Sequence, residues 1–140
     1  MHRHRSPVAL PDGTSIVGVS FDEAAAYDRV EPPDFGLYLD HRWNPPWPHE
    51  HLEWPDFGIP ADAAALRAAL TSFAARAAAG ATVEIGCWGG HGRTGTALAC
   101  LAVLAGQPAA DAVAWVRANY CEKAVETPGQ EQFVLDFGAA

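Results

Sequence analysis

The sequence predicts an α/β fold in which a small, mostly parallel central sheet is flanked by helices. Short strand-like segments occupy the first third of the chain, and helical patterns occupy most of the remainder. Between them, a short strand leads through a glycine-rich loop directly into a helix, a unit typical of layered α/β domains. The 140 residues are 49% apolar. This is enough for one buried core, so we expect residues 1–140 to form a single domain.

Three strands are expected, each a short apolar run next to Pro, Asp or Gly. They cover residues 14–19, 35–39 and 82–86. Residues 43–60 lie between the second strand and the first helix, and the many prolines of this stretch predict an irregular loop. Long loops in small domains usually serve function, so this stretch is a candidate part of a site.

The expected helices are marked by their end signals and by apolar residues at helical spacing. Residues 61–79 follow Pro60 and stop at Gly80, with Leu66 and Leu70 on one face. Thus one long helix is predicted before the glycine-rich loop. The other expected helices cover residues 93–105, 108–119 and 128–137.

The charge pattern limits the partners that we expect. The net charge is -8 at pH 7, and Lys and Arg form no basic cluster of the kind that nucleic-acid binding requires. No apolar run is long enough to span a membrane, and no secretory signal is recognisable. We therefore expect a cytoplasmic monomer that binds neither nucleic acid nor membrane. Three cysteines, an odd number, indicate reduced thiols rather than a disulfide framework.

The glycine-rich loop combines a thiol with groups that bind an oxyanion. Cys87 follows the third strand, and residues 88–92 can point successive backbone N–H groups inward as a phosphate nest. Arg93 adds a planar fork for two phosphate oxygens, and Thr94 offers a hydrogen bond to the sulfur. These donors and the helix N-terminus favour the thiolate, which is the nucleophilic form. The expected substrate-binding residues are Trp88, Gly89, Gly90, His91, Gly92 and Arg93.

The spacing Cys-x-x-Gly-x-Gly-Arg-Thr-Gly at residues 87–95 resembles the signature loop (P-loop) of the protein tyrosine phosphatase superfamily. Residues 54–60, Trp-Pro-Asp-Phe-Gly-Ile-Pro, resemble the mobile acid loop (WPD loop) of these enzymes. This loop precedes the cysteine, as it does in the tyrosine-specific and dual-specificity members. By this resemblance, Asp56 is the general acid and Trp54 anchors its loop.

Residues 125–133 resemble the glutamine loop of the tyrosine-specific enzymes, Val-Gln-Thr-x-x-Gln. The resemblance makes Gln130 the residue that orients the hydrolytic water, and Glu126 stands where the family has its first glutamine. Independently of any family, Thr127 and Gln130 have the spacing of a capping box, with Pro128 as the first helical residue. Both roles of Gln130 are therefore open.

The resemblance implies a cysteine-dependent phosphatase that hydrolyses phosphate monoesters through a thiophosphoryl-cysteine intermediate, without metal or cofactor. The implied substrate is a phosphorylated protein, above all phosphotyrosine, and the alternatives are a phosphoinositide or another small phosphate ester. Two other classes of function are also compatible with the motifs. One is a phosphate-binding pseudophosphatase, and the other is a rhodanese-type sulfur transferase, which also uses a loop cysteine.

The chain departs from the family on both sides of the nucleophile. Gly86 replaces the histidine that usually precedes the cysteine, and Trp88 replaces a small or polar residue. The first departure is expected to affect the organisation of the loop, and the second the width of the pocket mouth. Together they keep the pseudophosphatase alternative open.

Other polar and thiol groups have simpler interpretations. Residues 40–42 follow the second strand and are expected at the rim of the site. Cys100 is expected in the core, with a role as resolving thiol for oxidised Cys87 as the alternative. His49 and His51 are expected to be solvated, because no third metal ligand has a familiar spacing.

Overall fold

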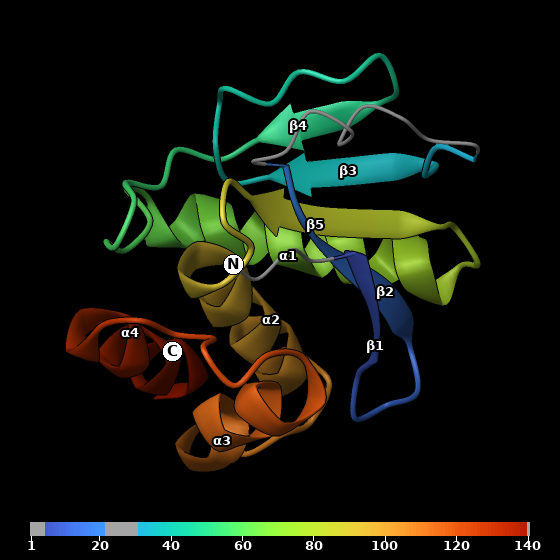
Figure 1. The fold of residues 1–140 in the computed structure, drawn as a ribbon. Helices are drawn as coiled ribbons and strands as arrows, with labels where there is room; N and C mark the ends of the chain where they lie inside the picture. Colours follow the sequence, from blue (N-terminus) through green and yellow to red (C-terminus); the bar gives the residue numbers. More distant parts are fainter. Residues whose placement is uncertain (1–4, 22–30, 140) are drawn as a thin grey trace.

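The structure, a computed structural model, describes residues 5–21 and 31–139, which form one five-stranded sheet and four helices (Figure 1). The strands are β1 (Arg5–Ala9), β2 (Ser15–Ser20), β3 (Phe35–Tyr38), β4 (His49–His51) and β5 (Val83–Cys87). Their order across the sheet is β1-β2-β5-β3-β4, with β1 antiparallel to β2 and all other neighbours parallel. The predicted small, mostly parallel sheet is confirmed.

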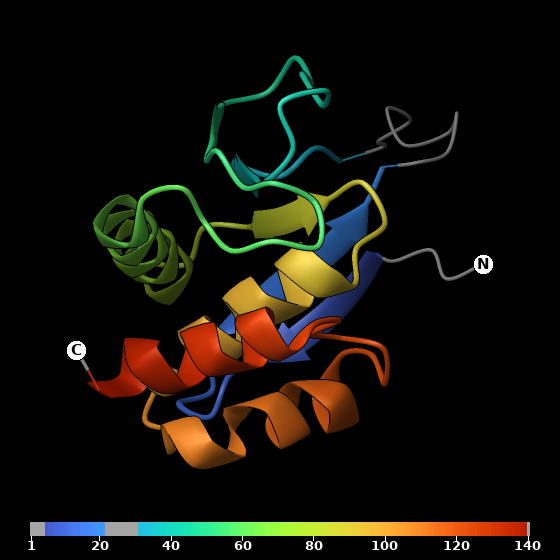
Figure 2. The same cartoon turned by 90° about the vertical axis from the view of Figure 1, so that its left-hand side faces the viewer.

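The helices gather on one side of the sheet, and the loop of residues 40–48 lies on the other (Figure 2). The helices are α1 (Ala63–Ala78), α2 (Gly92–Leu104), α3 (Ala109–Asn119) and α4 (Pro128–Ala139). α1 and α2 contact the strands, and α3 and α4 pack against α2. Among the described residues, no helix has the length and apolar character needed to cross a membrane.

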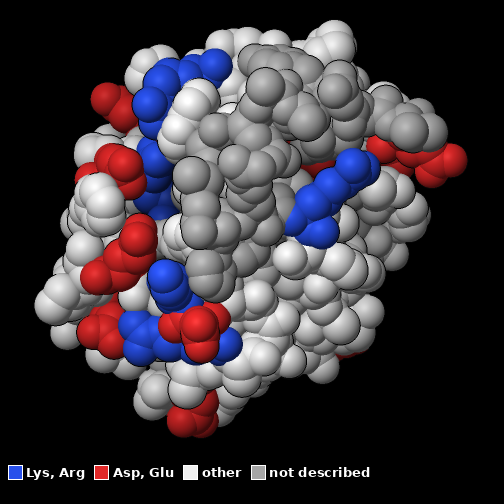
Figure 3. Space-filling view, in the orientation of Figure 1, with Lys and Arg blue, Asp and Glu red and all other residues white. Residues whose placement is uncertain are grey.

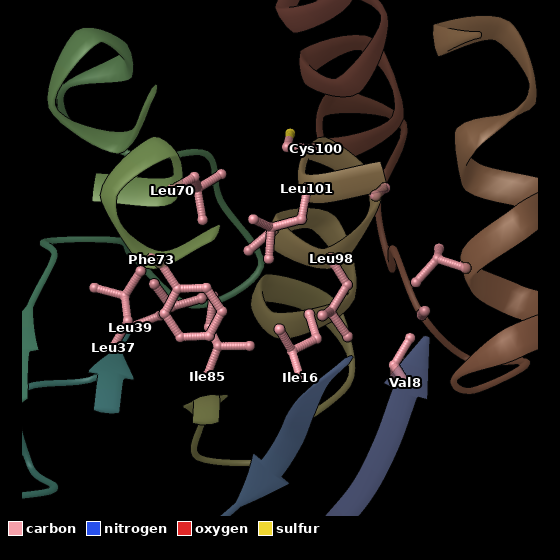
Figure 4. Packing of buried hydrophobic residues seen from close by; sticks show 14 of the residues in the cluster. Val8, Ile16, Leu37, Leu39, Leu70, Phe73, Ile85, Leu98, Cys100 and Leu101 are labelled. Carbon is pink, nitrogen blue, oxygen red and sulfur yellow. The ribbon is translucent and has the colours of Figure 1, made fainter. Parts of the chain in front are cut away.

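Alternate residues of the strands enter two separate apolar clusters, because successive side chains of a strand point to opposite faces. On the helix side, Leu37 and Ile85 of the sheet pack with Leu70 of α1 and Leu98 of α2 (Figure 4). This cluster holds α1 and α2 against the sheet. The cluster on the opposite face is mainly aromatic and consists of Val19, Phe21, Tyr38, Trp43 and Trp47.

A buried hydrogen-bonded chain ties the loop of residues 40–48 to the second face of the sheet. The Trp47 indole Nε1 donates to the Tyr38 hydroxyl at 2.7 Å, and this hydroxyl donates to the Glu84 carboxylate at 2.8 Å. The same loop stacks Trp43 on Phe21, with ring centroids 4.9 Å apart. An irregular, proline-rich segment is thereby fixed next to the ends of β3 and β5.

The sequence does not predict the two edge strands. β1 contains Pro7, which has no N–H to donate, and an edge strand tolerates such a residue. β4 lies within residues 43–60, so the prediction of an irregular loop is wrong for His49–His51. Both strands depend on pairing with a neighbour rather than on a strong apolar pattern. The other expected strands and helices are found, with ends shifted by up to two residues.

The parallel strands bring several chain segments to one edge of the sheet. In the register, Ser20 at the end of β2 lies beside Cys87, and Tyr38 at the end of β3 lies beside Gly86. Leu39 continues this alignment, since its N–H donates to the Gly86 carbonyl at 2.8 Å. Ligands of such sheets bind at the carboxyl ends of the strands, so this edge is the expected place for a site.

Gly86 fits this edge because there is no room for a side chain. A Cβ atom at this position would lie 2.7 Å from the Val19 carbonyl oxygen and 3.1 Å from the Phe21 ring. We expect Gly86→Ala to lower the free energy of unfolding by about 1–3 kcal/mol, the usual cost of overpacking. Urea denaturation measures this change.

The matched control is Gly129→Ala, where the nearest atom outside the helix lies 3.8 Å from the added Cβ. This variant should be neutral or slightly stabilising, because Ala is a better helix former than Gly. Equal free energies of unfolding for the two variants would contradict the close packing around Gly86.

Candidate active site

The glycine-rich loop between β5 and α2 holds Cys87 at the centre of the sheet edge. Cys87 is the last residue of β5 and is 2% exposed. The Gly90 N–H donates to its sulfur at 3.2 Å. Gly90 adopts a φ of 74°, a left-handed conformation in which glycine is favoured, and this turns its N–H toward the sulfur. The structure thus places one of the predicted inward-pointing amides on the thiol.

Two residues directly after α3 support the loop from outside. The Tyr120 hydroxyl donates to the Gly90 carbonyl at 2.5 Å. Burial raises the pKa of Tyr120, so its hydroxyl keeps the proton that it donates. The Cys121 sulfur lies 3.5 Å from Nδ1 of His91, the last residue of the loop. These contacts hold the loop conformation without any contribution from a histidine at position 86.

Arg93, in the first turn of α2, points its guanidinium into the protein. One terminal nitrogen donates to the carbonyls of Leu39 at 3.0 Å and Trp54 at 3.2 Å, and the other donates to Asp40 at 3.2 Å. The Arg93 side chain is 4% exposed. Within the described residues, its Nε and the hydroxyl of Thr94 are buried and have no hydrogen-bond partner, so the expected hydrogen bond from Thr94 to the Cys87 sulfur is not formed. Buried donors are usually paired, so these two fit an anionic ligand with oxygen acceptors.

Asp40 is a functional candidate that the sequence analysis placed only at the rim of the site. Its carboxylate accepts a bidentate pair from Arg42, at 2.9 Å and 2.5 Å, and also contacts Arg93. The Arg42 hydrogen bonds, together with the charges of both arginines, hold the pKa of Asp40 well below its usual range. The position of Asp40 directly after a predicted parallel strand was the signal that could have identified it.

Arg42 covers the mouth of the site. Its guanidinium carbon lies 4.2 Å from the centroid of the Trp88 ring, and its hydrogen bonds to Asp40 raise its pKa. This cation–π contact restricts the Trp88 side chain, which is still 36% exposed. On the face shown in Figure 3, acidic and basic side chains are interspersed along one edge. With a net charge of -8, an anion is therefore attracted by these local donors and not by the whole protein.

The predicted acid loop lies against Arg93. Asp56 Oδ1 is 3.6 Å from Arg93 Nε, and the Asp56 side chain is 57% exposed. Trp54 is buried, and its indole Nε1 donates to the Gly58 carbonyl at 2.8 Å, as expected of a loop anchor. A cavity of about 680 Å³ opens beside this loop. Its lining residues are Leu39, Asp40, His41, Arg42, His51, Leu52, Glu53, Trp54, Pro55, Asp56 and Arg93.

Gln130 is completely buried and connects the start of α4 with the acid loop. Its backbone N–H donates to the Thr127 hydroxyl at 3.1 Å, as a capping box requires. Its side-chain oxygen, however, accepts from Glu126 N at 2.8 Å, one residue earlier than that motif predicts. Its side-chain nitrogen donates to Gly58 O at 3.0 Å. Both ends of the amide are thus engaged, and the water-orienting role of Gln130 stays a prediction.

The remaining candidates lie as follows. Cys100 is buried eight residues into α2, where burial raises its pKa to about 12, which fits the core interpretation. His49 and His51 bond through their rings to the carbonyls of Trp47 and Trp43, at 2.7 Å and 2.6 Å. The described part of the chain contains no group of three or more His, Cys, Asp or Glu arranged to hold a metal ion.

One comparison with known proteins identifies a family. The model of one protein family matches residues 52–134. This family is described as the Swiss Army Knife protein, DSP-PTPase phosphatase domain. Two curated proteins of Methanocaldococcus jannaschii, both described as uncharacterized, are 50% identical over 58 residues and 51% identical over 55 residues. These matches cover 41% and 39% of this chain. The chain spans only about a third of the length of these relatives, 38% and 33% respectively.

Solved structures that share the fold include two phosphatases. The chain is similar to Tk-PTP in its active form, with a TM-score of 0.71 and 23% identity over 89% of this chain and 91% of that one. It is also similar to kinase associated phosphatase with its catalytic-site cysteine replaced by serine, with a TM-score of 0.79 and 16% identity. That alignment covers 100% of this chain and 98% of the other. At these identities the likeness concerns the fold.

Asp40 should contribute to stability in a pH-dependent way. Because its folded-state pKa is depressed, its contribution is present above the unfolded-state pKa of about 4 and is lost as the pH falls through the lower folded-state pKa. We expect Asp40→Asn to lower the free energy of unfolding by about 2 kcal/mol at pH 7. The difference from the native protein should narrow below about pH 4.

Urea denaturation at pH 7 and at decreasing pH values measures this difference. Asp111→Asn, at an exposed position of α3, is the control and should stay within about 0.5 kcal/mol of the native protein. A difference for Asp40→Asn that is the same at every pH would show that its charge is not what stabilises the fold.

Proposed function

The chain belongs to the DSP-PTPase family of phosphatase domains, and from this premise we propose that it hydrolyses phosphate monoesters, with protein phosphotyrosine as the preferred substrate. The observation that carries the proposal is the set of hydrogen-bond donors around the Cys87 thiol, which we call the cradle. The sulfur accepts the Gly90 N–H, and the buried Arg93 Nε and Thr94 hydroxyl are donors that make no hydrogen bond in the described chain. Such a set binds a tetrahedral oxyanion with a nucleophile directly behind it.

In the first step, the Cys87 thiolate attacks phosphorus and the bond to the leaving oxygen breaks. The loop amides and the Arg93 guanidinium stabilise the charge on the equatorial oxygens. Asp56 donates its proton to the leaving oxygen, which departs as a neutral alcohol or phenol. The position of Asp56 next to Arg93 Nε supports this role, because the phosphate bound by Arg93 would lie within its reach.

In the second step, water attacks the thiophosphoryl-cysteine intermediate, and the phosphorus–sulfur bond breaks to regenerate the thiolate. A carboxylate must take the proton of this water. Asp56 is ionised after the first step and is the base that the family resemblance implies. The reaction as proposed uses no cofactor, and Thr94 can stabilise the thiolate as it departs.

An aromatic phosphate ester fits the surroundings of the cradle. Phe57, which follows the general acid, is 62% exposed, and Trp88, which follows the nucleophile, is 36% exposed. Both are large apolar side chains next in sequence to reacting groups, and such rings stack on a phenyl group. This arrangement favours phosphotyrosine over phosphoserine and over small, fully polar phosphate esters.

The two other classes of function differ from this proposal in the need for a general acid. A pseudophosphatase binds phosphate without turnover, and sulfur transfer at a loop cysteine has no leaving alkoxide to protonate. The contact of Asp56 with Arg93 favours hydrolysis over both. Phosphoinositides remain within the proposed reaction and differ only in the leaving group.

The first test is the release of inorganic phosphate in the presence of a chelator. Phosphotyrosine peptides, phosphoserine peptides and phosphoinositides are compared for the native protein and for Cys87→Ser. We expect release that is fastest with phosphotyrosine and that vanishes in Cys87→Ser, because the hydroxyl is not activated as the thiol is. If the folded native protein releases phosphate from none of these substrates, the pseudophosphatase alternative takes precedence.

The second test concerns the general acid. We expect Asp56→Asn to lower kcat for phosphotyrosine peptides by about 10²–10⁴-fold, the usual contribution of a general acid. Asp111→Asn serves again as the distant control and should keep native turnover. Native turnover of phosphotyrosine peptides by Asp56→Asn would show that another group is the general acid, whereas cyanide-dependent formation of thiocyanate by the native protein would favour the sulfur-transfer alternative.

A further inference from the structure

A tyrosine outside the reacting groups is bonded to the backbone of the glycine-rich loop. Tyr120 directly follows α3 and is partly buried. Its hydroxyl donates to the Gly90 carbonyl at 2.5 Å, while the Gly90 N–H donates to the Cys87 sulfur at 3.2 Å. Tyr120 is therefore connected to the proposed nucleophile through a single residue of the loop.

The ring of Tyr120 is held in place by the sheet. A Cβ atom at Gly18 of β2 would lie 2.5 Å from Cε1 and 3.1 Å from the hydroxyl oxygen of Tyr120, so the ring occupies the space that a side chain at Gly18 would need. A glycine inside a strand often marks such a close approach of another group. The Tyr120 N–H also donates to the Val116 carbonyl at 2.9 Å. Ring and backbone together keep the hydroxyl beside the Gly90 carbonyl.

The hydrogen bond from Tyr120 sets the direction of one amide of the loop. The Gly90 carbonyl and the His91 N–H belong to the same peptide unit. This unit is trans and planar, so its carbonyl and its N–H point in opposite directions. Because the carbonyl is turned toward Tyr120, the His91 N–H is turned away from it.

The backbone on either side of this peptide has the pattern of an anion nest. Gly90 has a φ of 74°, whereas Gly89 before it does not have a positive φ. Such an alternation makes successive N–H groups converge on one point, where an anion binds. The converging groups here are the N–H groups of Gly89, Gly90 and His91. The amide that Tyr120 orients is therefore one of the donors of the nest.

The rest of His91 is fixed as well. Cys121, the residue after Tyr120, has its sulfur 3.5 Å from His91 Nδ1 and accepts the Lys123 N–H at 3.4 Å. The His91 carbonyl accepts the Gly95 N–H of α2 at 2.7 Å. With its side chain, its carbonyl and its preceding peptide all engaged, His91 presents its N–H in a defined direction.

The chemistry of a neutral hydroxyl suits this position. A carbonyl that accepts a hydrogen bond polarises its peptide, and the N–H of that peptide becomes a stronger donor. Burial, together with the negative charges of Cys87 and Cys121, raises the pKa of Tyr120. The hydroxyl therefore keeps its proton and adds no negative charge beside the thiolate.

We infer that Tyr120 is a positioning residue of the phosphate cradle, whose hydroxyl orients and polarises the peptide between Gly90 and His91. The N–H of this peptide then donates to a bound phosphate oxygen and favours the Cys87 thiolate. Gly86, directly before the nucleophile, has no side chain that could share this task. The inference deepens the proposed function and rests on it for the identity of the anion, a phosphate group.

The variant Tyr120→Phe removes the hydroxyl and keeps the ring that packs on Gly18. Two readouts that need no turnover measure its effect. The ultraviolet absorbance of the thiolate, corrected in each background with Cys87→Ser, gives the pH at which half of the Cys87 thiol is ionised. Calorimetric titration with inorganic phosphate gives the Kd. We expect this midpoint to rise by about 1 in pH and phosphate binding to weaken about tenfold, the loss of one hydrogen bond to a charged group.

Asn119→Ala is the matched control, because it removes one exposed hydrogen bond, to the Trp115 carbonyl, from the residue next to Tyr120. It should keep the native midpoint and the native Kd. Native values of both in Tyr120→Phe would overturn the inference even if urea denaturation showed a less stable protein, because the hydroxyl would then serve stability alone. Equal changes in Asn119→Ala would overturn it too.

The same experiment separates this inference from the proposed hydrolysis. A native protein that binds phosphate but releases none from its substrates would contradict hydrolysis, and the two expected changes in Tyr120→Phe would still support the inference. A native protein that binds no phosphate would overturn the phosphate cradle and, with it, the role of Tyr120.

Discussion

The buried guanidinium of Arg93 joins three segments that are far apart in the sequence. It belongs to the first turn of α2, donates to Leu39 at the end of β3, and donates to Trp54 at the start of the acid loop. A buried charge without partners is very costly, so these segments must come together for the protein to fold as it does. Asp40 completes the arrangement by supplying the opposite charge. The geometry of the site and the stability of the fold therefore depend on the same side chain.

This arrangement leaves part of Arg93 available for chemistry. The terminal nitrogens are used by the protein, whereas Nε has no hydrogen-bond partner among the described residues and lies near Asp56. The carbonyls and Asp40 hold the plane of the guanidinium, so its free edge is preorganised for an anion. Preorganised donors of this kind need no rearrangement when charge develops, which is the main electrostatic advantage of an enzyme site.

The carboxylates around the cradle have different environments. Asp40 is buried and strongly hydrogen-bonded by Arg42, which keeps it ionised and confines it to a structural task. Asp56 is half exposed on a loop, as a group that exchanges protons with substrate and solvent requires. Their surroundings, and not their chemistry as free acids, separate the two roles.

Local patterns in the sequence were enough to predict the strand–loop–helix unit around Cys87, the mostly parallel sheet and most helices, whereas the acid loop was predicted from a family resemblance. Each depends on local patterns: apolar spacing, glycines where the backbone turns, and short motifs. The tertiary structure alone decided the edge strands β1 and β4, the burial of Asp40 beneath Arg93, and the two partners of the Gln130 amide. It also placed the Tyr120 hydroxyl against the Gly90 carbonyl. These features arise from contacts between residues that are distant in the chain. Local periodicity does not encode such contacts, because a hydrogen bond or ion pair of this kind exists only after the sheet and helices have packed.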